Sequence, residues 1–174
     1  MLNIFFNKIN FIKIFPFLTI IFFILLSSTI YPPTGYAMTF SFVPIICIVF
    51  WTLLLGRFLN NIHCCFVGIF TDLLLGSPLG SYILLFAVIR FISLKIRDKF
   101  GINSFIKNII AAYVIIFIFF ILKYLFYMLY YSKIIFTEYI ILNILTTLFL
   151  YPLFAVLFNW IYKLMEIKKY YVET

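Results

Sequence analysis

The chain has 174 residues, of which 67% are hydrophobic, 23% aromatic and only 10% charged. A soluble domain usually carries about 45–50% apolar and about 25% charged residues, so the composition indicates an integral membrane protein without a separate soluble catalytic domain. The net charge of +8 does not indicate nucleic-acid binding, because the basic residues flank apolar segments, where cytoplasmic retention of Lys and Arg explains them.

Six apolar stretches are predicted to form membrane-spanning helices, because about 20 apolar residues cross a ~30 Å hydrocarbon core. In chain order they cover residues 14–31, 39–56, 58–76, 79–96, 105–131 and 138–165. The predicted fold class is therefore an all-α, six-helix transmembrane bundle, formed by one polytopic domain over residues 1–174. The first stretch also resembles a cleavable secretory signal. We favour an uncleaved helix, because Pro32 and Pro33 separate it from the small residues at 35–37.

The distribution of basic residues predicts the orientation of these helices. With both termini inside, all 13 lysines and arginines except Lys123 and Lys133 fall in cytoplasmic segments. This asymmetry is typical of multi-pass proteins, whose basic loops stay on the cytoplasmic side. We therefore expect six spans with both termini cytoplasmic.

Asp72 is the one acidic residue inside a predicted span, where a carboxylate costs about 2.5–3.5 kcal/mol at the helix centre. Small residues precede and follow it at a spacing of four, which places them on one helix face, and small residues let a second helix approach closely. We therefore predict a structural or partner-facing seam, and the carboxylate either caps the following turn or contacts a ligand or partner. The predicted seam consists of Gly68, Asp72, Gly76, Ser77, Pro78 and Gly80.

Lys123 is the other charge inside a predicted span. The third and fifth helices both run outward in the predicted topology, and both charges fall in their outer halves. We therefore predict a buried Asp72–Lys123 ion pair. The alternative is a lysine that extends alone to the membrane surface.

The sequence offers no candidate for catalysis, a cofactor or a metal. His63 is followed by Cys64 and Cys65, but adjacent cysteines point to different faces of a helix, and a structural metal site needs four ligands. No nucleophile–base pair and no glycine pattern for phosphate binding is present. A non-enzymatic protein without cofactor or metal is therefore expected.

The segment from Val67 to Gly80 resembles the signature of the MreD family of bacterial rod shape-determining membrane proteins. That family carries an Asp-Leu-(x)2-Gly-Ser-(x)-Leu-Gly segment, which this chain retains from Asp72 to Gly80. Weaker matches are Pro44 followed by Trp51, and the Tyr151-Pro152 pair before a basic tail.

The resemblance implies a non-enzymatic component of the cell-elongation machinery in the bacterial cytoplasmic (inner) membrane. The implied direct partner, besides the lipid bilayer, is an MreC-like bitopic membrane protein. Through it the chain would associate with the actin-like MreB, a SEDS-type glycan polymerase and a class B transpeptidase. The implied role is to help organise lateral peptidoglycan synthesis and cell shape.

A second function remains open, because the family's six-helix architecture resembles the substrate-binding S-component of energy-coupling-factor vitamin transporters. A bundle with one buried carboxylate, at Asp72, can hold a small ligand. Ligand pockets, however, usually combine apolar walls with several placed polar groups, and this sequence has few polar residues inside its spans.

Overall fold

The computed structural model describes residues 2–29, 43–56, 59–75, 77–101, 104–131 and 138–164. These residues form six α-helices, so the prediction of an all-helical protein is confirmed. The helices are α1 (Leu2–Thr29), α2 (Val43–Leu55), α3 (Asn61–Leu75), α4 (Ser81–Phe100), α5 (Phe105–Tyr131) and α6 (Glu138–Leu164). Each helix overlaps one of the six predicted stretches, although α1 begins well before residue 14.

Within the described residues, two of the helices are long and apolar enough to cross a membrane. They contain the apolar segments Phe105–Tyr130 of α5 and Ile141–Lys163 of α6. A helix suits hydrocarbon because it satisfies its own backbone hydrogen bonds. The 13 residues of α2 extend only about 20 Å at 1.5 Å per residue. A membrane crossing by all six helices therefore stays a prediction.

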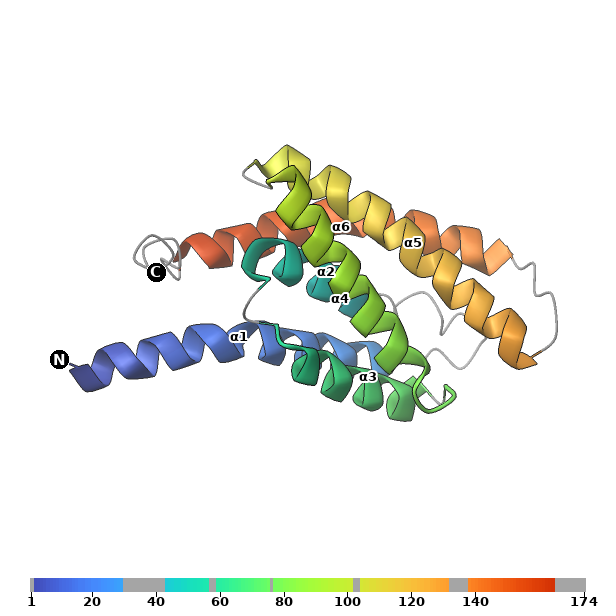
Figure 1. The fold of residues 1–174 in the computed structure, drawn as a ribbon, viewed down its shortest axis with the longest axis horizontal. Helices are drawn as coiled ribbons and strands as arrows, with labels where there is room; N and C mark the ends of the chain where they lie inside the picture. The colour runs from blue at the N-terminus through green and yellow to red at the C-terminus, as the bar shows by residue number, and fades with distance from the viewer. Residues whose placement is uncertain are drawn as a thin grey trace.

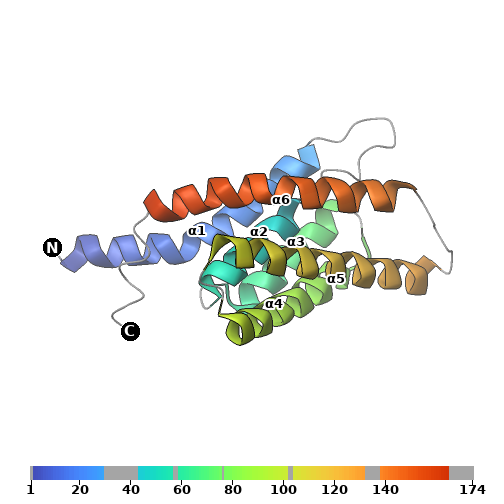
Figure 2. The same cartoon turned by 90° about the horizontal axis from the view of Figure 1, so that it is seen from above.

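The centre of the bundle is α2, which contacts α1, α4, α5 and α6 (Figures 1 and 2). Every residue of α2 except Leu54 is buried. A helix that is hydrophobic all round is expected in the interior of a protein or in a membrane. Here it forms the core around which the other helices pack.

Hydrogen bonds and aromatic contacts join α2 to its neighbours. The indole Nε1–H of the fully buried Trp51 donates to the Oγ1 of Thr19 on α1 at 3.0 Å. The Trp51 ring also lies 5.6 Å, between centroids, from that of Phe158 on α6. Two turns earlier in α6, the hydroxyl of Tyr151 donates to the Oδ1 of Asn108 on α5 at 3.2 Å. Trp51 and Tyr151, the weaker family matches in the sequence, therefore connect helices within the core.

The helices alternate in direction across the bundle (Figure 1). The start of α1 and the end of α6 lie at one end, and the ends of α1, α3 and α5 lie at the other. Alternating directions are compatible with the predicted topology, whose orientation in a membrane stays a prediction. The neighbouring pair α3 and α4 forms a hairpin on one side of α2.

Candidate functional site at the turn between α3 and α4

The carboxylate of Asp72 lies at the end of α3 and is 1% exposed. Its Oδ1 accepts hydrogen bonds from the Oγ of Ser77 at 2.6 Å, the Oγ of Ser81 at 2.9 Å and the backbone N–H of Tyr82 at 3.1 Å. Its Oδ2 accepts the backbone N–H of Gly80 at 2.8 Å. All four donors belong to the turn after α3 or to the first turn of α4.

This network caps the N-terminus of α4. The first N–H groups of a helix have no partner within the helix, and their partial positive charge favours an anion. The residue at the cap position, Gly80, has no side chain to serve as acceptor, and its φ of 99° lies in the left-handed region, which glycine adopts without steric cost. The carboxylate of Asp72 supplies the missing cap from the preceding helix.

Four donors offset the cost of burying this charge. Hydrogen bonds to an ionised acceptor are stronger than bonds between neutral groups. The geometry supports the interpretation of Asp72 as the acceptor that holds the turn. A further role in contacting a ligand or partner stays a prediction.

Gly68 lies on the same side of α3, where the backbone of α4 approaches closely. A Cβ atom at Gly68 would lie 2.5 Å from the Cα and 2.7 Å from the backbone N of Ile83. No side chain fits without moving one of the two helices, so Gly68 permits the close packing of α3 on α4. The structure thus places Gly68 and Asp72 at an interface inside this chain.

The other described residues of the seam lie in the turn. Ser77 and Gly80 donate to Asp72, and the backbone carbonyl of Pro78 accepts the N–H of Ser81 at 3.1 Å. Gly76 lies outside the described residues.

Lys123 and Asp72 contact one common residue, Tyr82. The Nζ of Lys123 lies 5.6 Å from the centroid of the Tyr82 ring, a distance at which the ring's quadrupole attracts a cation. The backbone N–H of Tyr82 donates to Asp72. A direct Asp72–Lys123 ion pair stays a prediction.

Arg90 of α4 is hydrogen-bonded to the segment where α3 begins, at the end of the hairpin away from Asp72. The sequence did not reveal this role. Its Nε–H donates to the carbonyl of Leu59 at 2.5 Å, and its Nη1 donates to the Oδ1 of Asn61. Both acceptors lie at the start of α3, far from Arg90 in the sequence. Charge patterning alone identified Arg90 only as a cytoplasmic cation.

The candidate metal residues do not converge in the part of the chain that the structure describes, where no group of three or more His, Cys, Asp or Glu side chains could hold a metal ion. The Nδ1 of His63 accepts the backbone N–H of Asn60 at 3.3 Å. Cys64 is buried and Cys65 is half-buried, and both are free thiols.

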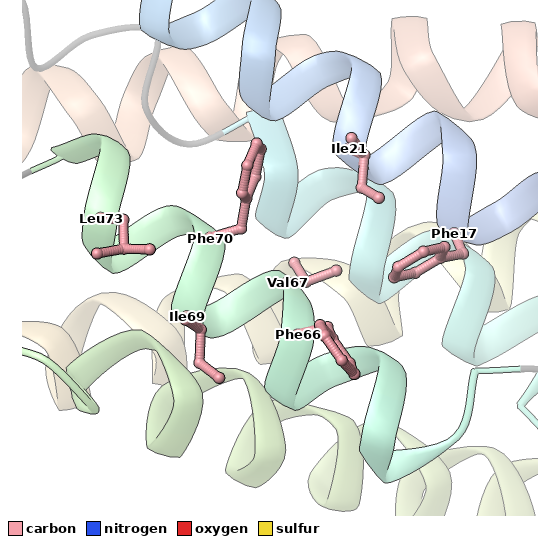
Figure 3. A pocket seen from close by; sticks show the side chains of 7 residues that line it. All are labelled: Phe17, Ile21, Phe66, Val67, Ile69, Phe70 and Leu73. Atoms are coloured by element: carbon pink, nitrogen blue, oxygen red, sulfur yellow. The ribbon is translucent and has the colours of Figure 1, made fainter.

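An apolar groove of about 150 Å³ lies between α1 and α3 (Figure 3). Asp72 does not contribute to its walls. The groove is lined by Phe17 and Ile21 of α1 and by Phe66, Val67, Ile69, Phe70 and Leu73 of α3.

Comparison with known proteins gives one match to a family. The model of the family described as "rod shape-determining protein MreD" matches residues 10–161, nearly the whole chain. No curated protein and no solved structure matches the chain significantly. The matched region contains the entire α3–α4 hairpin with its Asp72 network.

Proposed function

The chain belongs to the MreD family of rod shape-determining membrane proteins, and from this premise we propose that it is a non-enzymatic component of the bacterial cell-elongation machinery. In this role it helps to place lateral peptidoglycan synthesis. The observation that carries the proposal is the family match over residues 10–161. Family membership itself implies a role in determining rod shape.

The proposed location is the inner membrane, with six spans and both termini in the cytoplasm. The alternating helix directions (Figure 1) and the placement of the basic residues support this topology. An exposed apolar row on α5 provides further support, because a lipid-facing helix carries such a row at a spacing of three to four residues. The row consists of Ile106, Ile110, Val114, Phe117, Ile121, Leu125 and Leu129.

The proposed direct partner is an MreC-like bitopic membrane protein, through which the chain would reach MreB, the SEDS-type polymerase and the class B transpeptidase. A scaffold needs only helix and loop surfaces of fixed shape. The Asp72 and Arg90 contacts hold α3 and α4 together at both ends, and this supports a role in which the hairpin presents a rigid surface. Substitutions at Gly68 or Asp72 would then affect the partner by changing the hairpin's shape.

Affinity purification tests this function. A C-terminally tagged chain is solubilised in mild detergent, and the proteins that co-purify are identified by mass spectrometry. We expect recovery of an MreC-like bitopic protein. The tagged Gly68→Leu variant should lose this protein, while the matched variant Val114→Leu on the exposed row of α5 should retain it.

Two outcomes would contradict the proposal. Recovery of a pair of ATPases and a coupling membrane subunit would identify a transporter component. Recovery of no shape or cell-wall protein from membranes in which the tagged chain restores rod shape would exclude a stable complex. We do not propose transport, because both oxygens of Asp72 accept donors from this chain and the described groove is apolar, whereas a vitamin pocket needs placed polar groups.

A further inference from the structure

The surface where α4 ends and α5 begins combines exposed lysine and phenylalanine side chains. The α4–α5 patch consists of Phe91, Lys95, Lys99 and Phe100 of α4 and Phe105 and Lys107 of α5, and all six are exposed. Phe91 is 57% exposed and Phe100 is 63% exposed. The two helices pack against each other, and the end of one lies next to the start of the other (Figure 1).

The lysines of α4 lie against the phenylalanine rings of the patch. The Nζ of Lys95 lies 4.5 Å from the centroid of the Phe91 ring, and the Nζ of Lys99 lies 5.9 Å from that of the Phe100 ring. At these distances the ring attracts the cation, while the aliphatic part of the lysine covers apolar surface and its charge stays outside. The patch therefore presents positive charge and apolar surface side by side.

The patch lies where both helices change from apolar to charged. The apolar segment of α5 that is long enough to cross a membrane begins at Phe105. On the exposed face of α4, the apolar Leu84 and Phe91 are followed by Lys95 and Lys99. In the predicted spanning arrangement, this change marks the boundary between hydrocarbon and headgroups. The patch would then lie at the membrane surface.

Positive charge predominates in this part of the chain. Residues 81–107 contain five lysines or arginines and a single acidic residue, Asp98. Two of the five cations are used within the chain, because Arg90 donates to the start of α3 and the guanidinium of Arg97 lies against Gly56, directly after α2. The other three are the exposed lysines of the patch.

The combination of lysine and phenylalanine identifies the class of ligand. Cytoplasmic retention explains why the lysines stay on one side of a membrane, but it does not require exposed aromatic rings beside them. An acidic soluble partner likewise needs only the charges. An anionic phospholipid uses both features, because its phosphate binds an ammonium group and the upper part of its acyl chains contacts the rings. Interfacial helices combine Lys with Phe or Trp in this way.

We propose that the α4–α5 patch binds an anionic phospholipid. Lys95 and Lys99 contact the phosphate, and Phe91 and Phe100 lie against the upper part of the acyl chains. In the predicted topology this end faces the cytoplasm, so the lipid comes from the inner leaflet. The site does not depend on the proposed role in cell elongation, and it can be tested on the purified chain alone.

Photolabelling in vesicles provides the test. The full chain is reconstituted into phosphatidylcholine vesicles that contain a small fraction of phosphatidylglycerol with a diazirine near the carboxyl end of its acyl chain, and labelled peptides are mapped by mass spectrometry after illumination. We expect stronger labelling of residues 91–100 than of the last turn of α6, which also carries an exposed lysine, Lys163. Unlabelled phosphatidylglycerol should suppress the labelling of residues 91–100, and unlabelled phosphatidylcholine should not.

Matched charge variants locate the headgroup. Lys95→Gln and Lys99→Gln should each lower the labelling of residues 91–100 about fivefold, the factor that corresponds to about 1 kcal/mol of attraction for each lysine near an anionic surface. Lys163→Gln removes the same charge from the end of α6 and should leave this labelling unchanged. Lys99→Arg keeps the charge and should retain the labelling. Phe100→Ser should lower it while the preference for phosphatidylglycerol over a diazirine-labelled phosphatidylcholine remains.

The proposal fails if residues 91–100 and the end of α6 are labelled equally, a result that would favour an acidic protein segment as the occupant of the patch. It also fails if Lys163→Gln lowers the labelling of residues 91–100 as much as Lys99→Gln does, because the lipid would then respond only to total charge. Equal competition by the two unlabelled lipids would overturn the assignment of an anionic headgroup. Unchanged labelling of Phe100→Ser would overturn the contact between ring and acyl chain. If a variant does not fold, the competition experiment on the unmodified chain decides.

Discussion

Gly80 donates its backbone N–H to the Oδ2 of Asp72 at 2.8 Å, so the cap of α4 comes from the helix before it. The acceptor lies on α3, and the helix that it caps is α4. Loss of the carboxylate therefore affects the packing of α3 on α4 as well as the first turn of α4.

Asp72→Asn should destabilise the protein although the side chain keeps its size. The amide keeps one acceptor oxygen, but its NH2 group faces hydroxyl or N–H groups that donate hydrogen bonds to the carboxylate of Asp72. A buried donor left without an acceptor costs about 1–3 kcal/mol, and we expect a loss of unfolding free energy of this order. Thermal unfolding in detergent measures it. Asp98→Asn, at an exposed position of α4, is the control and should change stability by less than about 0.5 kcal/mol. Equal effects of the two substitutions would refute the capping role.

Gly68→Ala should be costly, because the atoms in its way are backbone atoms of Ile83. Overpacking of this kind costs about 1–3 kcal/mol, and a second substitution, Ile83→Ala, should not relieve it. Gly56→Ala is the matched comparison, since its nearest obstacles are the ends of the Arg97 and Leu94 side chains, which can move. Thermal unfolding and membrane accumulation of the variants measure the difference. Rescue of Gly68→Ala by Ile83→Ala would show that the helices do not touch through their backbones.

The hydrogen bond from Trp51 to Thr19 should be detectable by a double-mutant cycle. Trp51→Phe removes the indole donor, and Thr19→Val removes its acceptor. A net contribution of about 0.5–1.5 kcal/mol is typical of such a bond, so the double variant should be less destabilised than the sum of the single variants by that amount. Chemical unfolding in mixed micelles provides the free energies. Strict additivity would mean that α1 and α2 are held together by ring packing alone.

Lys123→Met tests the predicted ion pair. Residues that share a partner are non-additive by about 0.5–3 kcal/mol. Because Asp72 and Lys123 both contact Tyr82, we expect Lys123→Met and Asp72→Asn to be coupled within this range. Repeating the cycle with Tyr82→Leu separates the two explanations. A direct ion pair predicts that coupling persists without the ring, whereas coupling through Tyr82 disappears with it. Additive effects in both backgrounds would exclude the pair.

The helices could be predicted because long apolar runs between Gly, Pro and Asn breaks leave the backbone one favourable conformation in hydrocarbon. The early start of α1 was missed, since residues 2–13 mix Asn and Lys with apolar residues and show no continuous apolar run. The sequence also could not predict that α2 lies at the centre of the bundle. A helix that is apolar on every side carries no periodicity to distinguish burial in protein from exposure to lipid.

Part of the candidate site could also be predicted from the sequence. The spacing of Gly68 and Asp72 identified one helix face, and the Gly-Ser-Pro composition identified a turn. The sequence could not identify the donors to each carboxylate oxygen of Asp72. These donors depend on the path of the turn through Gly80, whose φ is in the left-handed region. Nor could it pair Arg90 with Leu59 and Asn61, because that contact requires knowing how α4 crosses α3.

The enclosure of α2 has a consequence for the order of assembly. A chain synthesised from its N-terminus delivers α2 before α4, α5 and α6 exist, so the surface around Trp51 that later contacts Phe158 is at first uncovered. In water such a surface would promote aggregation. In the predicted six-span topology, the acyl chains of the bilayer solvate this surface, so α2 stays in contact with lipid until α6 is inserted. That topology therefore predicts that lipid occupies the place of α6 during biogenesis.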